Sequence, residues 1–322
     1  MIKQEPLFFE PYLKSVIWGG SKIAAYKGIV SDEAQIGESW EISEVPGHES
    51  VVADGEYNGM NLSELIARYG VELLGAKVYR RYGGKFPLLV KIIDACDNLS
   101  VQVHPDDELA MKRHGSLGKT EMWYIIDSDP GSKIYAGLSK EITPEEYVKS
   151  VERNEFAELL AVHESEKGDV FFLPAGRVHA IGAGNLLAEI QESSDVTYRI
   201  YDYDRRDASG KGRELHTSQA KDAIDYKVYA DYKSARPDDS VAECELSKCS
   251  HFDVRRFLVD GETLLTGDSD SFTVVMCISG VVEVVCADGS RQICQGTTVL
   301  VPACCREIKL SGHGTVITAR VP

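Results

Sequence analysis

The chain has 322 residues, of which 43% are hydrophobic, so it can bury a full core, and its length favours two domains over one. It carries 35 Lys and Arg against 51 Asp and Glu, which gives a formal net charge of -16. Because this charge repels polyanions at long range, we expect no nucleic-acid partner and no membrane partner, and any anionic ligand needs a local cluster of cations.

Apolar runs in the sequence are short. No stretch approaches about 18 uninterrupted apolar residues, and the first residues lack the apolar run of a secretion signal. We therefore expect a cytoplasmic protein. We also expect a monomer or a weak homodimer. The eight cysteines include no Cys-x-x-Cys pair, which favours reduced thiols with packing roles. Adjacent Cys304 and Cys305 would point to opposite faces of a strand, so we expect no shared role for them.

Three segments have the pattern of helices added around a β core: residues 61–78, about 105–115 and 143–160. The first has Asn61 or Ser63 as its N-cap candidate. Acidic residues after Pro105 favour the positive end of a helix dipole. The third begins with the N-cap Thr143, a proline at the first helical position and the capping-box residue Glu146.

Runs of β-branched and aromatic residues predict the strands. In the first half these are residues 86–93, 121–127, 169–173, 186–191 and 196–203. In the second half they are residues 271–278, 280–286 and 297–301. We therefore expect a first domain over residues 1–205 and a polar connector over 206–240, with a short helix near 217–225. A small all-β domain follows over 241–322. The predicted fold is mainly β with added helices.

Possible metal ligands occur in three separate segments. Gln102 and His104 are two residues apart, so on a strand they share a face. Glu121 begins the next predicted strand, and glycine and proline after residue 168 favour a turn that delivers His179 from another strand. Two imidazoles, a carboxylate and an amide oxygen suit zinc, with water or substrate completing the site. The sequence therefore predicts one Zn²⁺ per chain.

The spacing Gly-x5-Pro-x-Gly-x2-His of residues 168–179 recurs, with changes, in residues 296–307. In the second copy Cys304 replaces the turn glycine and Glu307 replaces the histidine. This repeat predicts two related barrels, of which the first binds the metal and the second is degenerate. The spacing resembles the second motif of the cupin superfamily, which implies two cupin-like jelly-roll barrels.

A closer resemblance spans almost the whole chain. It is carried by residues 14–20, 36–43, 86–92, 99–107, 118–121 and 174–179. These segments resemble the type I mannose-6-phosphate isomerases in their shorter bacterial form. The resemblance implies a zinc-dependent aldose-ketose isomerase that interconverts mannose 6-phosphate and fructose 6-phosphate. Its implied zinc ligands are Gln102, His104, Glu121 and His179.

The same resemblance implies residues around the sugar, which are Trp18, Lys119, Glu189 and Arg199. It implies phosphate-side positions at Ser100, Lys91 and Arg205. Isomerisation needs a base, and the sequence leaves open whether Glu189 or Lys119 takes the proton. Lys119 lies two residues before Glu121, where a nearby dication would lower its pKa. Arg199 stays protonated and suits an oxyanion or a phosphate.

Two other functions are compatible with a metal-binding cupin. One is a non-catalytic protein that binds or senses sugar phosphates, which would need no proton-transfer group. The other is an iron dioxygenase, which is disfavoured because Gln102 stands where a further histidine would be expected. Lys91 lies in an apolar run, so it predicts either a structural ion pair or a substrate contact.

Overall fold

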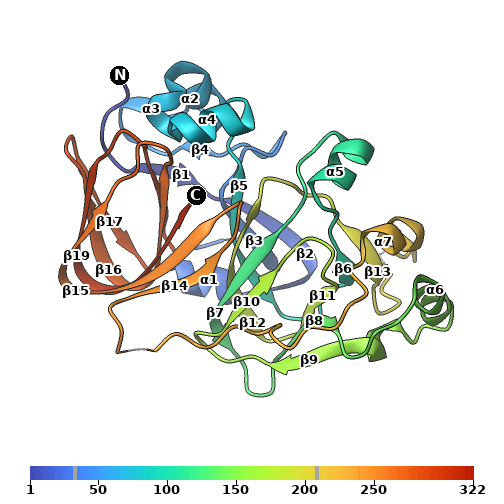
Figure 1. Cartoon of the computed structure of the whole chain (residues 1–322). Coiled ribbons are helices and arrows are strands. Elements are labelled where there is room, and N and C mark those ends of the chain that lie inside the picture. Colours follow the sequence, from blue (N-terminus) through green and yellow to red (C-terminus); the bar gives the residue numbers. More distant parts are fainter. Residues whose placement is uncertain (32–34, 207–209, 239) are drawn as a thin grey trace.

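The computed structural model describes residues 1–31, 35–206, 210–238 and 240–322 (Figure 1). Within these residues the strands form three antiparallel sheets. The first sheet, in spatial order, contains β10 (Val170–Leu173), β7 (Glu121–Ser128), β12 (Asn185–Glu192), β5 (Leu88–Ala95), β3 (Ile36–Ile42) and β2 (Tyr12–Gly20). The second contains β13 (Tyr198–Tyr201), β6 (Val101–Val103), β11 (His179–Ile181), β8 (Lys133–Leu138) and β9 (Leu160–Glu164).

The third sheet is built mainly from the C-terminal part of the chain. It contains β14 (Glu243–Lys248), β15 (Asp253–Thr266), β19 (Glu307–Arg320), β16 (Thr273–Val285), β18 (Thr298–Val301), β1 (Leu7–Glu10) and β4 (Val51–Val52), with β17 (Ser290–Cys294) paired to β16. These long curved strands form the group at the left of Figure 1. The three sheets are open rather than closed barrels, and the fold is mainly β, as the jelly-roll expectation requires.

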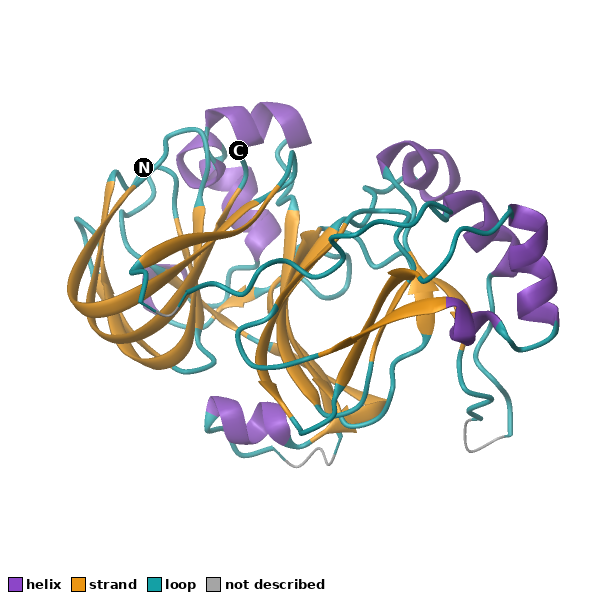
Figure 2. Cartoon of the chain, turned by 60° about the horizontal axis from the view of Figure 1, so that its bottom comes forward, coloured by secondary structure: helices purple, strands orange, loops and turns teal. Residues whose placement is uncertain are grey.

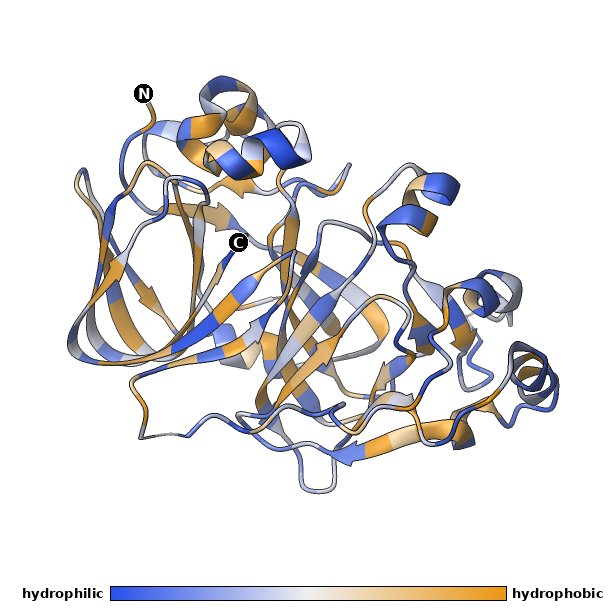
Figure 3. Cartoon of the chain, viewed as in Figure 1, coloured by the Kyte–Doolittle hydropathy of each residue, from blue (hydrophilic) through white to orange (hydrophobic). Residues whose placement is uncertain are grey.

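The helices lie outside the strands (Figure 2). They are α1 (Lys22–Lys27), α2 (Leu62–Tyr69), α3 (Val71–Leu74), α4 (Ala76–Tyr82), α5 (Asp107–His114), α6 (Pro144–Glu152) and α7 (Thr217–Ala223), with 3-10 turns at η1 (Gly55–Tyr57) and η2 (Phe156–Leu159). Figure 3 shows α5 largely hydrophilic and the strands rich in hydrophobic residues. No helix in the described part of the chain is long and apolar enough to cross a membrane.

One hydrophobic core lies between the first two sheets. It joins Ile93 and Trp123 of the first sheet to Ile134 and Ile181 of the second. A larger core lies on the other face of the first sheet, where side chains of β5 and β12 pack with α2 to α4 and with strands of the third sheet. Successive strand residues face opposite ways, so a strand buried on both faces is apolar almost throughout. This explains the continuous apolar run of β5.

Several expected boundaries are wrong in detail. Gly70 and Gly75, both with positive φ, divide the expected helix 61–78 into α2, α3 and α4, and Asn61 rather than Ser63 is the N-cap. The third helix has the expected capping box, but it ends at Glu152 instead of residue 160. Asn154 takes a left-handed φ of 58°, which breaks the helix before η2 and β9.

In the C-terminal half, the expected strands 271–278 and 280–286 form one strand, β16, with a register shift between Cys277 and Ser279. This is a bulge, and it lies beside Gly280 with its φ of 82°. Cys304 and Cys305 lie in the turn between β18 and β19 rather than on a strand. The expectation of opposite strand faces is therefore wrong, although all eight cysteines are free thiols.

The domain boundaries stay a prediction, but two N-terminal strands lie outside the first expected unit. β1 pairs with β18 and β4 pairs with β1, so the start of the chain completes the C-terminal sheet. The internal repeat is visible as a shared strand-turn-strand order. In the first copy β10 leads through a turn to β11, and in the second β18 leads through a turn to β19.

Candidate metal centre and active site

Three metal-binding side chains converge between the first and second sheets. Glu121 begins β7 of the first sheet, His179 begins β11 of the second, and His104 directly follows β6. One ligand atom from each residue lies within 4.8 Å of the others, and all three residues are buried. The sandwich therefore brings together donors that are up to 75 residues apart in the sequence.

Backbone hydrogen bonds orient both imidazoles. Nδ1 of His104 lies 2.9 Å from the Val196 carbonyl oxygen, and Nδ1 of His179 lies 2.9 Å from that of Arg177. Since a carbonyl only accepts, each Nδ1 carries the proton and each Nε2 presents a lone pair. Burial and the charge of Lys119 lower the pKa of both rings, that of His179 to about 3. Both histidines are therefore neutral, which is the form that binds a metal.

The burial and contacts of the Glu121 carboxylate indicate whether a cation fits between the two imidazole rings. Its side chain is 0% exposed, and neither oxygen accepts a well-directed hydrogen bond within the described residues. His179 Nε2 lies 3.2 Å from Oε1, and His104 Nε2 lies 3.5 Å from Oε2. Two lone pairs thus lie close to a carboxylate, and the Lys119 ammonium, 3.1 Å from His104 Nε2 and 2.8 Å from Glu121 Oε2, supplies positive charge on one side of them. A metal ion between the three donors would stabilise them further. Burial raises the pKa of Glu121 to about 8, which a bound cation would oppose.

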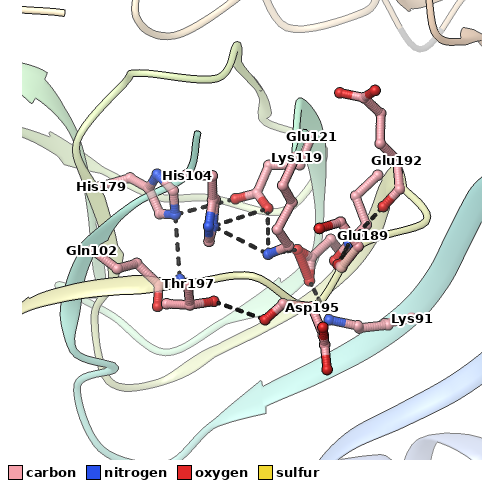
Figure 4. Close-up of polar contacts among 12 residues, drawn as sticks. Lys91, Gln102, His104, Lys119, Glu121, His179, Glu189, Glu192, Asp195 and Thr197 are labelled. Atoms are coloured by element: carbon pink, nitrogen blue, oxygen red, sulfur yellow. Dashed lines mark hydrogen bonds and ion pairs between the residues drawn. The ribbon is translucent and has the colours of Figure 1, made fainter. Parts of the chain in front are cut away.

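Gln102 lies beside the two histidines. It pairs with His179 across β6 and β11, and its Nε2 lies 3.3 Å from His179 Nε2 (Figure 4). Amide nitrogen and oxygen exchange places when the group rotates by 180°, so the Gln102 oxygen can occupy the same position. All four residues expected to bind the metal are therefore brought together.

A chain of alternating charges leads away from these donors. Lys119 Nζ lies 2.8 Å from Glu121 Oε2 and 3.6 Å from Glu189 Oε1. Lys91 Nζ then lies 3.6 Å from Glu189 Oε2 (Figure 4). It also lies 3.5 Å from Glu38 Oε2. The β-sheet register explains part of this chain, because Lys91 and Glu189 are direct cross-strand partners on β5 and β12.

The charge chain sets the protonation of the two candidate bases. Burial alone would raise the pKa of Glu189, but the Lys91 and Lys119 ammoniums outweigh it and lower this pKa. Burial alone would lower the pKa of Lys119, but the charges of Glu121 and Glu189 raise it above its usual value. Among the protein groups, Glu189 is therefore the ionised carboxylate and Lys119 the protonated amine. The expected lowering of the Lys119 pKa depends on a bound dication and stays a prediction.

A cavity of about 400 Å³ opens onto the charge chain. Of the expected substrate-site residues, those that line it are Trp18, Lys91, Ser100, Lys119, Glu189 and Arg199. Arg205 lies elsewhere, with its guanidinium 3.0 Å from Asp202 and 3.5 Å from Asp97. Lys91 combines both expected roles, since it forms ion pairs and also lines the cavity.

Sequence reasoning missed several residues of this cavity. They include Lys14, Glu38, Trp40, Asp195, Thr197 and Arg213. Glu38 and Trp40 lie in one of the segments that carried the family resemblance, and the Trp40 indole donates to Glu38 at 2.8 Å. Arg213 comes from the polar connector, where nothing in the local sequence distinguished it from a solvated arginine.

A mainly β fold with histidine and carboxylate donors between two of its sheets defines a cupin with a candidate metal site. Residues 7–124 match the family model of the catalytic domain of type I phosphomannose isomerase, and residues 242–321 match that of the mannose-6-phosphate isomerase cupin domain. The mannose-6-phosphate isomerase ManA of Bacillus subtilis is 37% identical over 98% of this chain and 99% of its own. The chain belongs to the type I family of mannose-6-phosphate isomerases.

Two further relatives agree with this assignment. A mannose-6-phosphate isomerase of Streptococcus mutans is 42% identical over 68% of each chain. The crystal structure of the Bacillus subtilis mannose 6-phosphate isomerase superimposes with a TM-score of 0.87 at 32% identity, covering 98% of this chain and 99% of that one. The protein is therefore an isomerase of this family.

The depressed pKa of His179 makes the stability of metal-free protein depend on pH. As the pH falls below about 6.5, the unfolded state takes up a proton that buried His179 binds only near 3. The stability contributed by His179 is therefore lost as the pH falls, by about 1 kcal/mol between pH 6.5 and 5.5, whereas the raised pKa of Glu121 acts in the opposite direction. Urea unfolding of chelator-treated wild type and His179→Gln isolates the His179 contribution, because over this range wild type should lose about 1 kcal/mol more stability than the variant. Parallel curves for the two proteins would contradict the assigned protonation.

Proposed function

We propose that this protein interconverts mannose 6-phosphate and fructose 6-phosphate through an enediol or enediolate, with one Zn²⁺ held by Gln102, His104, Glu121 and His179. The observation that carries the proposal is the ionised Glu189 carboxylate, which lines the cavity next to the buried histidine and carboxylate donors. A protein that only binds sugar phosphates would not need a base at this position.

The donor set supports zinc in particular. Two neutral imidazole nitrogens and a carboxylate oxygen form a common catalytic zinc set, and an amide oxygen is a compatible fourth donor. When bound, zinc supplies Lewis acidity that stabilises negative charge on oxygen during the reaction. Glu121 would then lie between its metal and Lys119, whose ammonium is 2.8 Å from Oε2 and holds the carboxylate in place.

Glu189 is the group that we assign to proton transfer. In the forward direction its carboxylate accepts the proton from C2 of the aldose, the electron pair of the broken C–H bond forms the C1–C2 double bond, and the pair of the C1 carbonyl moves onto O1. The same group then returns the proton to C1, while the hydroxyl proton of O2 passes to O1 and the electron pair of the broken O2–H bond forms the C2 carbonyl. The raised pKa of Lys119 makes it a hydrogen-bond donor to these oxygens rather than the base.

The phosphate would be bound by cations at the mouth of the cavity. Arg199 and Arg213 both line it, and Nε of Arg199 has no hydrogen-bond partner among the described residues. Burial and the neighbouring Arg213 charge lower the pKa of the Arg199 guanidinium. A bound phosphate dianion would raise this pKa again. Such a cluster meets the need for local cations in a chain of net charge -16.

The proposal predicts a metal-dependent isomerase. Purified protein should form fructose 6-phosphate from mannose 6-phosphate in a coupled assay, lose this activity on chelation and regain it with zinc, because charge on the sugar oxygens is otherwise poorly stabilised. Metal content should be measured on the same samples. Full turnover in protein shown to be metal-free would contradict the zinc assignment.

Metal binding and proton transfer should separate by mutation. Glu189→Gln should keep its zinc but lose turnover by about 10²- to 10⁴-fold, the usual contribution of a general acid-base group. His179→Ala should lose zinc and activity together. Glu164→Gln, at an exposed position on β9, is the matched control and should behave like wild type. If Glu189→Gln lost its zinc as His179→Ala does, Glu189 would have to be a metal ligand instead.

A further inference from the structure

A second group of metal-binding side chains lies outside the candidate active site. It consists of Asp107, Glu192 and His251, with one ligand atom from each residue within 4.8 Å of the others. Asp107 begins α5, Glu192 ends β12, and His251 lies in the loop between β14 and β15. The group therefore joins the C-terminal sheet to the sandwich that holds the active site.

Both carboxylates are held in place by backbone amides of one short segment. Glu192 Oε2 accepts a hydrogen bond from Thr120 N at 2.8 Å, and Asp107 Oδ1 accepts one from Gly118 N at 2.8 Å. Each carboxylate thus uses one oxygen for orientation and has a second oxygen for another partner. Hydrogen bonds of this kind typically fix the direction of metal-binding carboxylates.

Glu192 and His251 face each other at the centre of the group. The Glu192 side chain is 2% exposed, and its Oε1 lies 2.8 Å from Nδ1 of His251, an ion pair without a well-directed hydrogen bond. The Glu192 carboxylate raises the pKa of His251, so a metal ion at this position would replace the proton of the imidazole. Figure 4 shows this carboxylate pointing away from Glu189 on the same strand.

We propose that Asp107, Glu192 and His251 bind a second divalent cation of the zinc class. One imidazole and two carboxylates favour a borderline metal such as zinc over calcium or magnesium, which prefer oxygen donors alone. Arg81 donates to the Ser250 carbonyl at 2.6 Å, so its positive charge lies near the group and reduces the affinity. The bound cation would connect the loop of the third sheet to the segment that carries Lys119 and Glu121.

Zinc stoichiometry tests this site independently of the catalytic metal. Wild type, Asp107→Asn and His251→Gln should be incubated with excess Zn²⁺, passed through gel filtration and analysed by elemental mass spectrometry. We expect wild type to retain one zinc more than either variant. The test compares the zinc content of wild type with that of each variant, so its result does not depend on how much zinc the site at His179 binds. His179→Ala should remove a separate equivalent and leave the second one.

His313→Gln is the matched control, because His313 forms an exposed 2.8 Å pair with Asp260 in the third sheet and belongs to no donor group of three among the described residues. It should retain as much zinc as wild type. Asp107 is exposed, so Asp107→Asn keeps the test decisive if His251→Gln does not fold. Equal zinc contents in wild type and folded Asp107→Asn would overturn the proposal and leave His251 and Glu192 as a simple ion pair.

Discussion

The buried Glu121 carboxylate is the constraint on which the active site depends. Two neutral imidazoles and Lys119 surround it. Lys119 also pairs with Glu189, and Glu189 pairs with Lys91, so that positive and negative charges alternate along the chain of side chains. Removing one partner of a buried ion pair costs about 3 to 5 kcal/mol, because the other charge stays uncompensated. Such a chain is therefore stable only as a whole, and a cation between Glu121 and the histidines would complete it.

The fold makes this charge chain possible by burying both faces of one sheet. Alternate residues of β5 and β12 pack against the helices and the C-terminal sheet, and the residues between them face the active-site cavity. A polar row can cross the interior in this way without interrupting the hydrophobic core. The C-terminal unit thus supports the catalytic sheet from behind, which gives the second, degenerate copy of the repeat a structural role.

Local spacing made the donor residues predictable. Gln102 lies on β6 and His104 directly follows this strand, and a turn with glycine and proline leads to His179 on the neighbouring strand β11, so the spacing in the sequence indicated that these residues meet. The role of Glu38 was not predictable in this way, because it depends on Lys91, a partner distant in the sequence, although Glu38 lies in a segment that carried the family resemblance. Arg213 was not predictable either, because its surroundings in the sequence look like an ordinary polar loop. Arg205 does not line the cavity, because it pairs with Asp202, three residues before it, and with Asp97 of a distant segment. The predicted end of a helix was wrong where one residue with left-handed φ, such as Asn154, ended the helix although the apolar pattern continued.

The most direct test of the central claim is a diffraction measurement at the zinc absorption edge on crystals of zinc-loaded protein. The account predicts an anomalous peak within coordination distance of His104 Nε2, His179 Nε2 and a Glu121 oxygen, with the Gln102 amide oxygen turned towards it. Absence of a peak there in fully active crystals, or a Glu121 carboxylate paired with some other group, would contradict it.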